Sequence, residues 1–559
     1  MKPISLALTL LIGTAIAFAQ VDEARQAIEQ GEYVRAMNLL TPALADRPTA
    51  DTYLYLGIAY RHMREYQKAE DTFREGSVRY ATDLRFYIEL ANLFLENKDV
   101  DAAKSELRRV LTIDPNNNYA SDELATIDMS EGEVQSALRA WNKSDRPYIA
   151  DILHNYYLNF GSWVVRRAVT FHPAGTLRYN AWKTTESRLL ATDDFANVGL
   201  EVEPTRVPDQ YNAVVRTTAK VNSLALVLFN LVKGAPIQTT YLDVWNIRNS
   251  GINFNSDYRW QANRRRFDGY LKIPVPVAGL LHLEIGDTWR SENWNTSPII
   301  EDAYLGQARF LYKGNGIRVN VKHIPQYRVE LGAGFEYRNR AARGDIPQLF
   351  LNNLNTGRFS AEMNLRLADS AYQNRLHVEA FAARPSIVGQ ARFTGGIGEL
   401  NNRLQLSKDS RTFFDWTLKG GTVRGAQGAL PIDDYFMLGV DTRVTNLLRG
   451  YAETQHGQYG RGPLGTDFVL LNADVERRLA TIPLFNTLNI PFISVKWEVF
   501  FDAGQTWDRN HIFKPSKLLL DTGAGLRFET PTHSFNVGYG RGLRGGQNVF
   551  FGYYERRLW

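Results

Sequence analysis

Apolar and polar residues alternate with a period of two along much of the chain after about residue 225. One run places Phe359, Ala361, Met363, Leu365 and Leu367 opposite Arg358, Ser360, Glu362, Asn364 and Arg366. Another places Val495, Trp497, Val499 and Phe501 opposite Lys496, Glu498 and Asp502. Such alternation predicts strands with one apolar and one polar face. Because a soluble sandwich would not carry Arg and Glu so regularly along one face of many strands, the pattern predicts a transmembrane antiparallel β-barrel with lipid outside and water inside.

The length of this region sets the expected number of strands. Residues 223–559 accommodate about sixteen strands at roughly 21 residues per strand and turn, and an even number is usual for single-chain bacterial barrels. The chain ends on Trp559, an aromatic C-terminal residue of the kind that marks outer-membrane barrels for assembly. Arg557 departs from that pattern, because an apolar residue usually stands two positions before the end.

Residues 20–150 carry a different, repeating pattern. A turn motif followed by a small residue occurs four times: Gly31-Glu32-Tyr33 with Ala36, Arg64-Glu65-Tyr66 with Ala69, Lys98-Asp99-Val100 with Ala103, and Gly132-Glu133-Val134 with Ala137. The steps of 33, 34 and 34 residues match the tetratricopeptide (TPR) period, which predicts an all-α solenoid of helix pairs. Such a solenoid has a concave groove, and we expect it to recruit a periplasmic protein partner.

Residues 158–222, between the repeats and the barrel, change pattern again. The order predicted is a strand from Val165 to Phe171, a helix over 179–192, a strand over 195–202 and a last strand near 213–215. This short α/β module resembles a polypeptide-transport-associated (POTRA) domain in the residues Leu190, Phe195, Asn197 and Val198. The resemblance implies an open sheet edge that captures an extended client by strand addition. A plain structured linker is the alternative.

The first nineteen residues have the features of a secretory signal peptide. Lys2 provides a positive charge, residues 4–18 are almost wholly apolar, and Ala17-Phe18-Ala19 forms a cleavage site that ends at Ala19. We therefore expect an exported protein, with the TPR repeats and the POTRA-like module in the periplasm and the barrel in the bacterial outer membrane. No other stretch reaches the roughly 18 consecutive apolar residues of a membrane helix.

The composition argues against several classes of function. The chain has no cysteine, which excludes disulfides and a thiolate metal site. Its net charge of +5 is small for 559 residues and does not indicate nucleic-acid binding. Because G-x-S-x-G, P-loop and H-E-x-x-H motifs are absent and the nine histidines are scattered, we expect no enzymatic activity, cofactor or metal. Acidic pairs such as Asp433-Asp434 are interpreted as parts of solvated loops. The sequence does not indicate an oligomeric state.

Five motifs follow one another in the last 125 residues. They are Leu448-Arg449-Gly450-Tyr451 after Phe436-Met437-Leu438-Gly439, the strand Asn472–Arg478, Phe501-Asp502-Ala503-Gly504, the strand and turn Gly523–Pro531, and the terminal Leu558-Trp559. In content and order they resemble the C-terminal half of the bacterial surface antigen family, to which the BamA and TpsB-type barrels belong. Thr532-His533 stands where that family usually has Gly after Thr-Pro, a departure that concerns the turn only.

The resemblance implies a sixteen-stranded barrel with a loop folded into its lumen. In that arrangement Arg449, which precedes Gly450 and Tyr451, pairs with lumen carboxylates, which we place at Glu476 and at Asp502 near Gly504. Strand parity agrees independently, since both carboxylates lie on the polar faces of their strands. A guanidinium that forks onto carboxylates is geometrically selective, so lysine would not replace it. The alternative is that Arg449 is one of many lumen charges.

Taken together, the sequence predicts a multidomain chain: a signal peptide (1–19), TPR repeats (20–150), a POTRA-like module (158–222) and an outer-membrane barrel (223–559). We expect it to insert or translocate protein, or lipid, clients in contact with outer-membrane lipid. The main alternative is a TPR-fronted pore that exports a polysaccharide, with Arg264-Arg265-Arg266 on a basic lumen face; a third is a passive scaffold. A loop 440–465 inside the barrel favours the first, and an open lumen the second.

Overall fold

The computed structural model divides into two compact units. The first comprises residues up to 153 with 171–179 and 200–214, and the second comprises 154–170, 180–199 and 215–559. The structure describes residues 20–556 except 47, 155–161, 209, 221, 223, 234, 236–237, 278–279, 296–308, 347–349, 352, 370–371, 386–387, 408, 410, 426–429, 439–447, 452–463, 484–491, 509–512, 530–532 and 545–547. The expected signal peptide with Ala19, and the terminal Trp559, lie outside the described residues.

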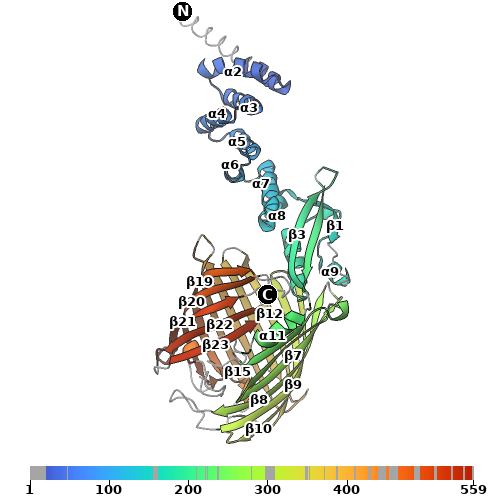
Figure 1. The fold of residues 1–559 in the computed structure, drawn as a ribbon, viewed down its shortest axis with the longest axis vertical. Helices are drawn as coiled ribbons and strands as arrows, with labels where there is room; N and C mark the ends of the chain where they lie inside the picture. Colours follow the sequence, from blue (N-terminus) through green and yellow to red (C-terminus); the bar gives the residue numbers. More distant parts are fainter. Residues whose placement is uncertain are drawn as a thin grey trace, which may run out of the picture. The chain divides into compact units, whose positions relative to one another are not determined.

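Four helix pairs follow one another in the first unit (Figure 1). They are the helical residues 20–29 with α2 (Tyr33–Asp46), α3 (Ala50–His62) with α4 (Tyr66–Arg79), α5 (Leu84–Glu96) with α6 (Val100–Ile113), and α7 (Asn118–Ser130) with α8 (Val134–Trp141). The turn inside each pair contains a residue in the left-handed region: Gly31, Arg64, Lys98 and Gly132, with φ of 78°, 62°, 62° and 82°. The sequence period therefore reflects a backbone turn that recurs once per helix pair.

Close packing between these helices depends on small residues. A Cβ on Gly57 of α3 would lie 2.3 Å from Cε1 of Phe73 in α4. A Cβ on Gly76 of α4 would likewise lie 2.4 Å from Cε1 of Phe86 in α5. Both phenylalanines are fully buried, so each aromatic ring fills the space that a neighbouring side chain would otherwise need.

The α/β module forms a four-stranded sheet in the order β2-β1-β4-β3. Its elements are β1 (Tyr148–His154), α9 (Ser162–Ala168), β2 (Gly175–Thr176), α10 (Tyr179–Leu190), β3 (Phe195–Pro204) and β4 (Gln210–Ala219). The strand predicted from Val165 to Phe171 is wrong, because residues 162–168 are helical. Val164, Val165 and Ala168 are buried together, and positions i, i+1 and i+4 share one face of a helix. The sheet also begins with β1, before the expected boundary at residue 158.

The turn after α10 lies against the barrel strands within the second unit. Lys272 Nζ is 3.0 Å from Oδ2 of Asp193, and Asn253 Nδ2 donates a hydrogen bond of 2.6 Å to the carbonyl of Thr192. The next residue, Asp194, is fully buried. Burial raises the pKa of the Asp194 carboxyl to about 7, because a buried carboxylate loses its hydration.

The large sheet has fifteen antiparallel strands in its described part, where the sequence predicts about sixteen. They are β5 (Thr239–Val244), β6 (Asn253–Gln261), β7 (Arg264–Val275), β8 (Leu281–Asn295), β9 (Arg309–Gln326), β10 (Val329–Gly344), β12 (Asn355–Asp369), β13 (Tyr372–Ala383), β14 (Phe393–Gln405), β15 (Thr412–Gly425), β19 (Asp467–Pro483), β20 (Phe492–Trp507), β21 (Leu519–Glu529), β22 (His533–Gly542) and β23 (Asn548–Arg556). Figure 1 shows this sheet curving into a barrel. Where the barrel was expected to begin, the chain forms the apolar helix α11 (Leu224–Lys233). Among the residues described, none of the helices has both the length and the apolar character to cross a bilayer.

The two faces of the barrel strands have inverted burial. In β20, Val499 is 48% and Phe501 40% exposed, whereas Glu498 and Asp502 on the other face are 1% and 0% exposed. In a protein surrounded by water the apolar side chains would be the buried ones. The inversion is what an apolar solvent outside the barrel requires, so the transmembrane barrel predicted from the alternation is confirmed.

The connection between β15 and β19 lies inside the barrel. Its described residues, 430–438, 448–451 and 464–466, are called the lumen loop and contain β16 (Leu430–Pro431), η5 (Ile432–Asp434), β17 (Phe436–Met437), η6 (Arg449–Tyr451) and β18 (Leu464–Gly465). Its apolar side chains form one buried cluster with inner-wall residues of eight strands, including Trp294, Tyr312, Ala342, Phe381, Phe393, Val423, Phe468 and Leu519. Of the loop 440–465 considered above, residues 448–451 and 464–465 are described, and they are in the lumen.

Candidate functional site

Arg449 of the lumen loop binds two carboxylates of the barrel wall. Its Nε and Nη2 atoms lie 2.8 and 2.5 Å from the two oxygens of Asp502 on β20. Its Nη1 lies 2.6 Å from Oδ1 of Asp474 on β19. The backbone N–H of Arg449 also donates to Asp502, over 3.2 Å. Since the arginine is only 3% exposed, the two-pronged contact is shielded from water and fixes both position and orientation of the loop.

An aromatic ring supports the guanidinium from the same wall. The Cζ atom of Arg449 lies 3.7 Å from the ring centroid of Phe500, which is 1% exposed. Phe500 shares the inner face of β20 with Asp502, because positions i and i+2 point the same way along a strand. A cation over an aromatic face is attracted to it, and the attraction is stronger when both groups are desolvated.

Gly450 and Tyr451 complete the contact with the next strands. The Gly450 N–H donates to Oδ2 of Asp521 on β21 over 2.9 Å. A Cβ on Gly450 would lie 2.5 Å from Cβ of Asp521 and 2.7 Å from the backbone nitrogen of Gly542, so a larger residue does not fit. The Tyr451 hydroxyl donates to the carbonyl of Arg544 over 2.5 Å and accepts from its N–H over 3.1 Å.

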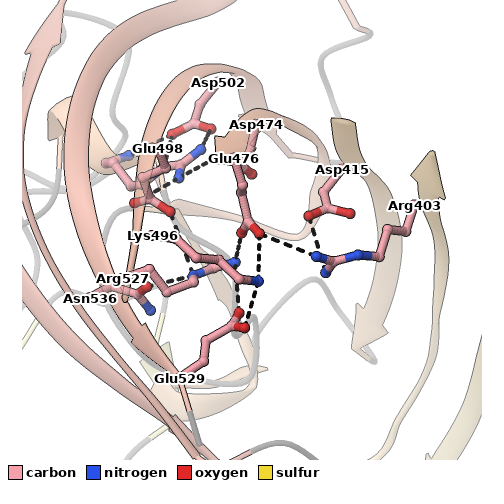
Figure 2. Close-up of polar contacts among 11 residues, drawn as sticks. Arg403, Asp415, Asp474, Glu476, Lys496, Glu498, Asp502, Arg527, Glu529 and Asn536 are labelled. Carbon is pink, nitrogen blue, oxygen red and sulfur yellow. Dashed lines mark hydrogen bonds and ion pairs between the residues drawn. The ribbon is translucent and has the colours of Figure 1, made fainter. Parts of the chain in front are cut away.

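Glu476 was expected to pair with Arg449, and this pairing is not present in the structure. Glu476 instead binds Lys496 at 3.0 Å, Arg403 at 3.5 Å and Arg527, as Figure 2 shows. Asp474, the neighbouring residue on the same inward face of β19, binds Arg449 in place of Glu476. The alternation of side chains identified the correct face of the strand. It does not determine which residue along that face contacts the arginine.

Glu476 belongs to a second, mixed-charge cluster next to the Arg449 site. Lys496 joins Glu476 to Glu529, with 2.5 Å between its Nζ and Oε2 of Glu529, and Arg403 joins Glu476 to Asp415 (Figure 2). These side chains come from four strands, β14, β15, β19 and β20, and from the end of β21. The cluster ties neighbouring strands together on the inner wall, and Glu498 joins it to the Arg449 site, at 3.5 Å from Nε of Arg527 and 3.9 Å from Nη1 of Arg449 (Figure 2).

Gly504 provides room for the lumen loop rather than a polar contact. A Cβ on Gly504 would lie 3.1 Å from Cδ1 of Leu438 and 3.2 Å from Cδ2 of Leu448, both in the loop. The sequence interpretation missed two other partners, Asp474 as a ligand of Arg449 and Asp521 as the acceptor for Gly450. Asp474 lies on the polar face of β19 that strand parity had identified, whereas Asp521 lies before the strand motif that the sequence analysis placed at 523–531. In the described part of the chain, no group of three His, Asp or Glu side chains is arranged to hold a metal ion.

Fold and site together define a transmembrane β-barrel whose lumen loop is bound to the inner wall through an arginine. Residues 359–549 match the model of the Omp85 superfamily domain, and residues 84–117 match a tetratricopeptide repeat. Most of the barrel is therefore an Omp85 superfamily domain, the class of the BamA and TpsB-type barrels. This finding confirms the resemblance to the bacterial surface antigen family and the TPR assignment.

Solved structures of the same class are similar in fold. CdiB from Escherichia coli has a TM-score of 0.50 at 11% identity, over 78% of this chain and 86% of that chain. CdiB from Acinetobacter baumannii has 0.49 at 12% identity, over 80% and 81%. BamA from Haemophilus ducreyi lacking POTRA domains 1–3 has 0.44 at 11%, over 73% and 84%. No curated protein sequence matches the chain.

Proposed function

We propose that the protein inserts or translocates protein, or lipid, clients at the outer membrane, and that the bound lumen loop holds the barrel in its working state. The observation that carries the proposal is the two-pronged contact of Arg449 with Asp502, extended by Asp474. The Omp85 domain over residues 359–549 supports the same conclusion.

The periplasmic part of the proposal concerns recruitment. We assign the TPR groove to a periplasmic protein partner, because a solenoid of four helix pairs presents an extended concave surface. We assign client capture to the module strand β3, which stands at the edge of the sheet order β2-β1-β4-β3. An edge strand has unpaired backbone groups on one side, and an extended client segment can add to them.

The rival function, a polysaccharide pore, is less well supported. A hydrated polymer needs a continuous polar path, whereas apolar side chains of the lumen loop and of the inner wall form one buried cluster. The three arginines 264–266 do not share a basic face either. Arg264 is buried, Arg265 is exposed on the opposite face, and Arg266 is paired with Glu292 at 3.2 Å.

The test compares Arg449→Ala with Arg318→Ala in cells at equal barrel levels. Arg318 also pairs with a wall carboxylate, Asp268, at 2.6 Å, but it joins two strands and does not contact the lumen loop. Quantitative mass spectrometry of outer-membrane and secreted proteins is the readout. We expect Arg449→Ala to deplete at least one client and Arg318→Ala to deplete none. Unchanged protein levels in the Arg449→Ala strain would contradict the proposed role of the loop.

A further inference from the structure

The acidic pair Asp433-Asp434 is buried inside the barrel, although the sequence interpretation placed it in a solvated loop. Both residues belong to η5 at the start of the lumen loop. Their side chains are 4% and 1% exposed. Buried carboxylates are retained in proteins when cations or hydrogen-bond donors compensate them. The partners of this pair therefore show what holds this end of the loop.

Two arginines of β10 compensate the acidic pair. Arg340 Nε lies 2.6 Å from Oδ1 of Asp433, and its Nη2 lies 3.1 Å from Oδ2 of Asp434. Arg338 also pairs with Asp433, through its Nη1. Arg340 donates a further hydrogen bond to the hydroxyl of Thr356 on β12. One guanidinium thus bridges both acids of the loop while it is fixed to the wall, an arrangement that a single point charge would not provide.

The two held positions of the lumen loop, Asp433-Asp434 and Arg449, lie at different parts of the barrel wall. In the sheet order, β10 is five strands from β19 and six from β20, out of fifteen. Six steps around such a sheet lead close to the opposite wall, so Asp434 and Arg449 are held at widely separated parts of the inner wall. The charges are arranged in opposite ways at the two positions. At Asp433-Asp434 the loop supplies carboxylates to arginines of the wall, and at Arg449 it supplies an arginine to carboxylates of the wall.

We propose that Arg338 and Arg340 form a second holding site for the lumen loop, with Asp433 and Asp434 as its ligands, and that the lumen stays closed only while this site is occupied. The inference rests on the proposed function in so far as the loop has to be movable. Release of this end leaves charged groups of both signs without partners in the lumen, which is costly unless water enters with them. Opening of the lumen is therefore coupled to the loss of these ion pairs.

The experiment measures ion conductance of the purified full-length protein in planar lipid bilayers. The double variant Asp433→Asn with Asp434→Asn keeps side-chain volume and removes both negative charges. We expect its mean conductance to rise several-fold over the wild type. Asp268→Asn is the matched control, because it removes one acid from the wall-to-wall pair with Arg318, and wild-type conductance is expected. A double variant with wild-type conductance overturns the proposal.

A second variant separates a released loop from a misfolded barrel. The chain has no cysteine of its own, so Phe350→Cys with Leu430→Cys introduces one pair of thiols. These positions are partners in the short parallel pairing of β11 (Phe350–Leu351) with β16. In the Asp433→Asn/Asp434→Asn background, oxidation is expected to restore low conductance and reduction to raise it again. High conductance in the oxidised protein means that the loop position does not close the lumen, and the proposal fails.

The conductance and the export assays fail independently. Raised conductance of the double variant together with unchanged client levels in the Arg449→Ala strain supports the second holding site and refutes the proposed function. Unchanged conductance together with client loss in Arg449→Ala overturns the second holding site and leaves the proposed function intact. Both variants need to show the heat-modifiable migration of the folded barrel before they are compared.

Discussion

Replacement of Arg449 by lysine tests whether geometry or charge alone holds the lumen loop. The arginine side chain makes three charge-assisted hydrogen bonds, at 2.8 and 2.5 Å to Asp502 and at 2.6 Å to Asp474. A lysine keeps the positive charge but reaches one carboxylate at a time. The loss of two of the three bonds, at about 1–1.5 kcal/mol each, destabilises the bound loop by roughly 2–3 kcal/mol. The ratio of bound to released loop then falls roughly 30- to 150-fold.

The assay uses a single introduced cysteine as a reporter of loop release. Leu464→Cys is suitable, because Leu464 is 8% exposed within the lumen cluster and the chain has no other cysteine. When maleimide reacts more slowly than the loop closes again, the labelling rate is proportional to the fraction of molecules with a released loop. Arg449→Lys should therefore raise the labelling rate roughly 30- to 150-fold. Arg318→Lys is the control. Arg318 forks onto Asp268 with bonds of 3.1 and 2.6 Å, but this pair joins two strands and not the lumen loop. Equal labelling rates for Arg449→Lys and the wild type would refute the argument.

Three further predictions concern other sites. Gly450→Ala places a Cβ 2.5 Å from that of Asp521, so it should release the loop by about 1–3 kcal/mol in the same labelling assay, and a wild-type rate would contradict this. Gly57→Ala places a Cβ 2.3 Å from Phe73 and should destabilise the TPR helices by a similar amount. Proteolysis of the full chain measures this effect, and Gly199→Ala, with open space around it, is the control. Because burial raises the pKa of Asp194 to about 7, its ionisation opposes folding, and stability should fall as pH rises from about 4 to 7 by up to about 4 kcal/mol. Asp194→Asn should flatten this melting profile, and an unchanged slope would exclude Asp194 as its source.

The sequence predicted best those features that local periodicity determines. The TPR turns recur because each helix pair needs a left-handed residue at one position, and Arg64 and Lys98 meet this need as Gly31 does. The barrel strands were recognisable because lipid on one side imposes a period of two over 10 residues or more. In both cases the signal repeats many times, so that single exceptions do not obscure it.

The sequence predicted less well those features that depend on which elements meet. A short run such as 164–168, in which Val164, Val165 and Ala168 flank two arginines, fits a strand or a helix equally, and the helix formed. Alternation put Glu476 and Asp474 on the same face, but the arrival of Arg449 beside Asp474 depends on the path of a distant loop. Asp433-Asp434 was taken for a surface turn, because nothing near it in the sequence reveals the arginines of β10, more than 90 residues away.

The position of the lumen loop in the sheet order has a consequence for its movement. The loop joins β15 to β19, and these two strands pair directly with each other from Thr412 and Arg477 to Thr422 and Asp467. Both ends of the connection thus emerge from one hairpin at neighbouring points. The described parts of the lumen loop can leave the inner wall without breaking any rung of the fifteen-stranded ladder. Movement of this kind leaves the wall intact, so its energetic threshold is set by the contacts of the loop itself: its ion pairs, the N–H groups of Arg449 and Gly450, and the short pairing of β16 with β11.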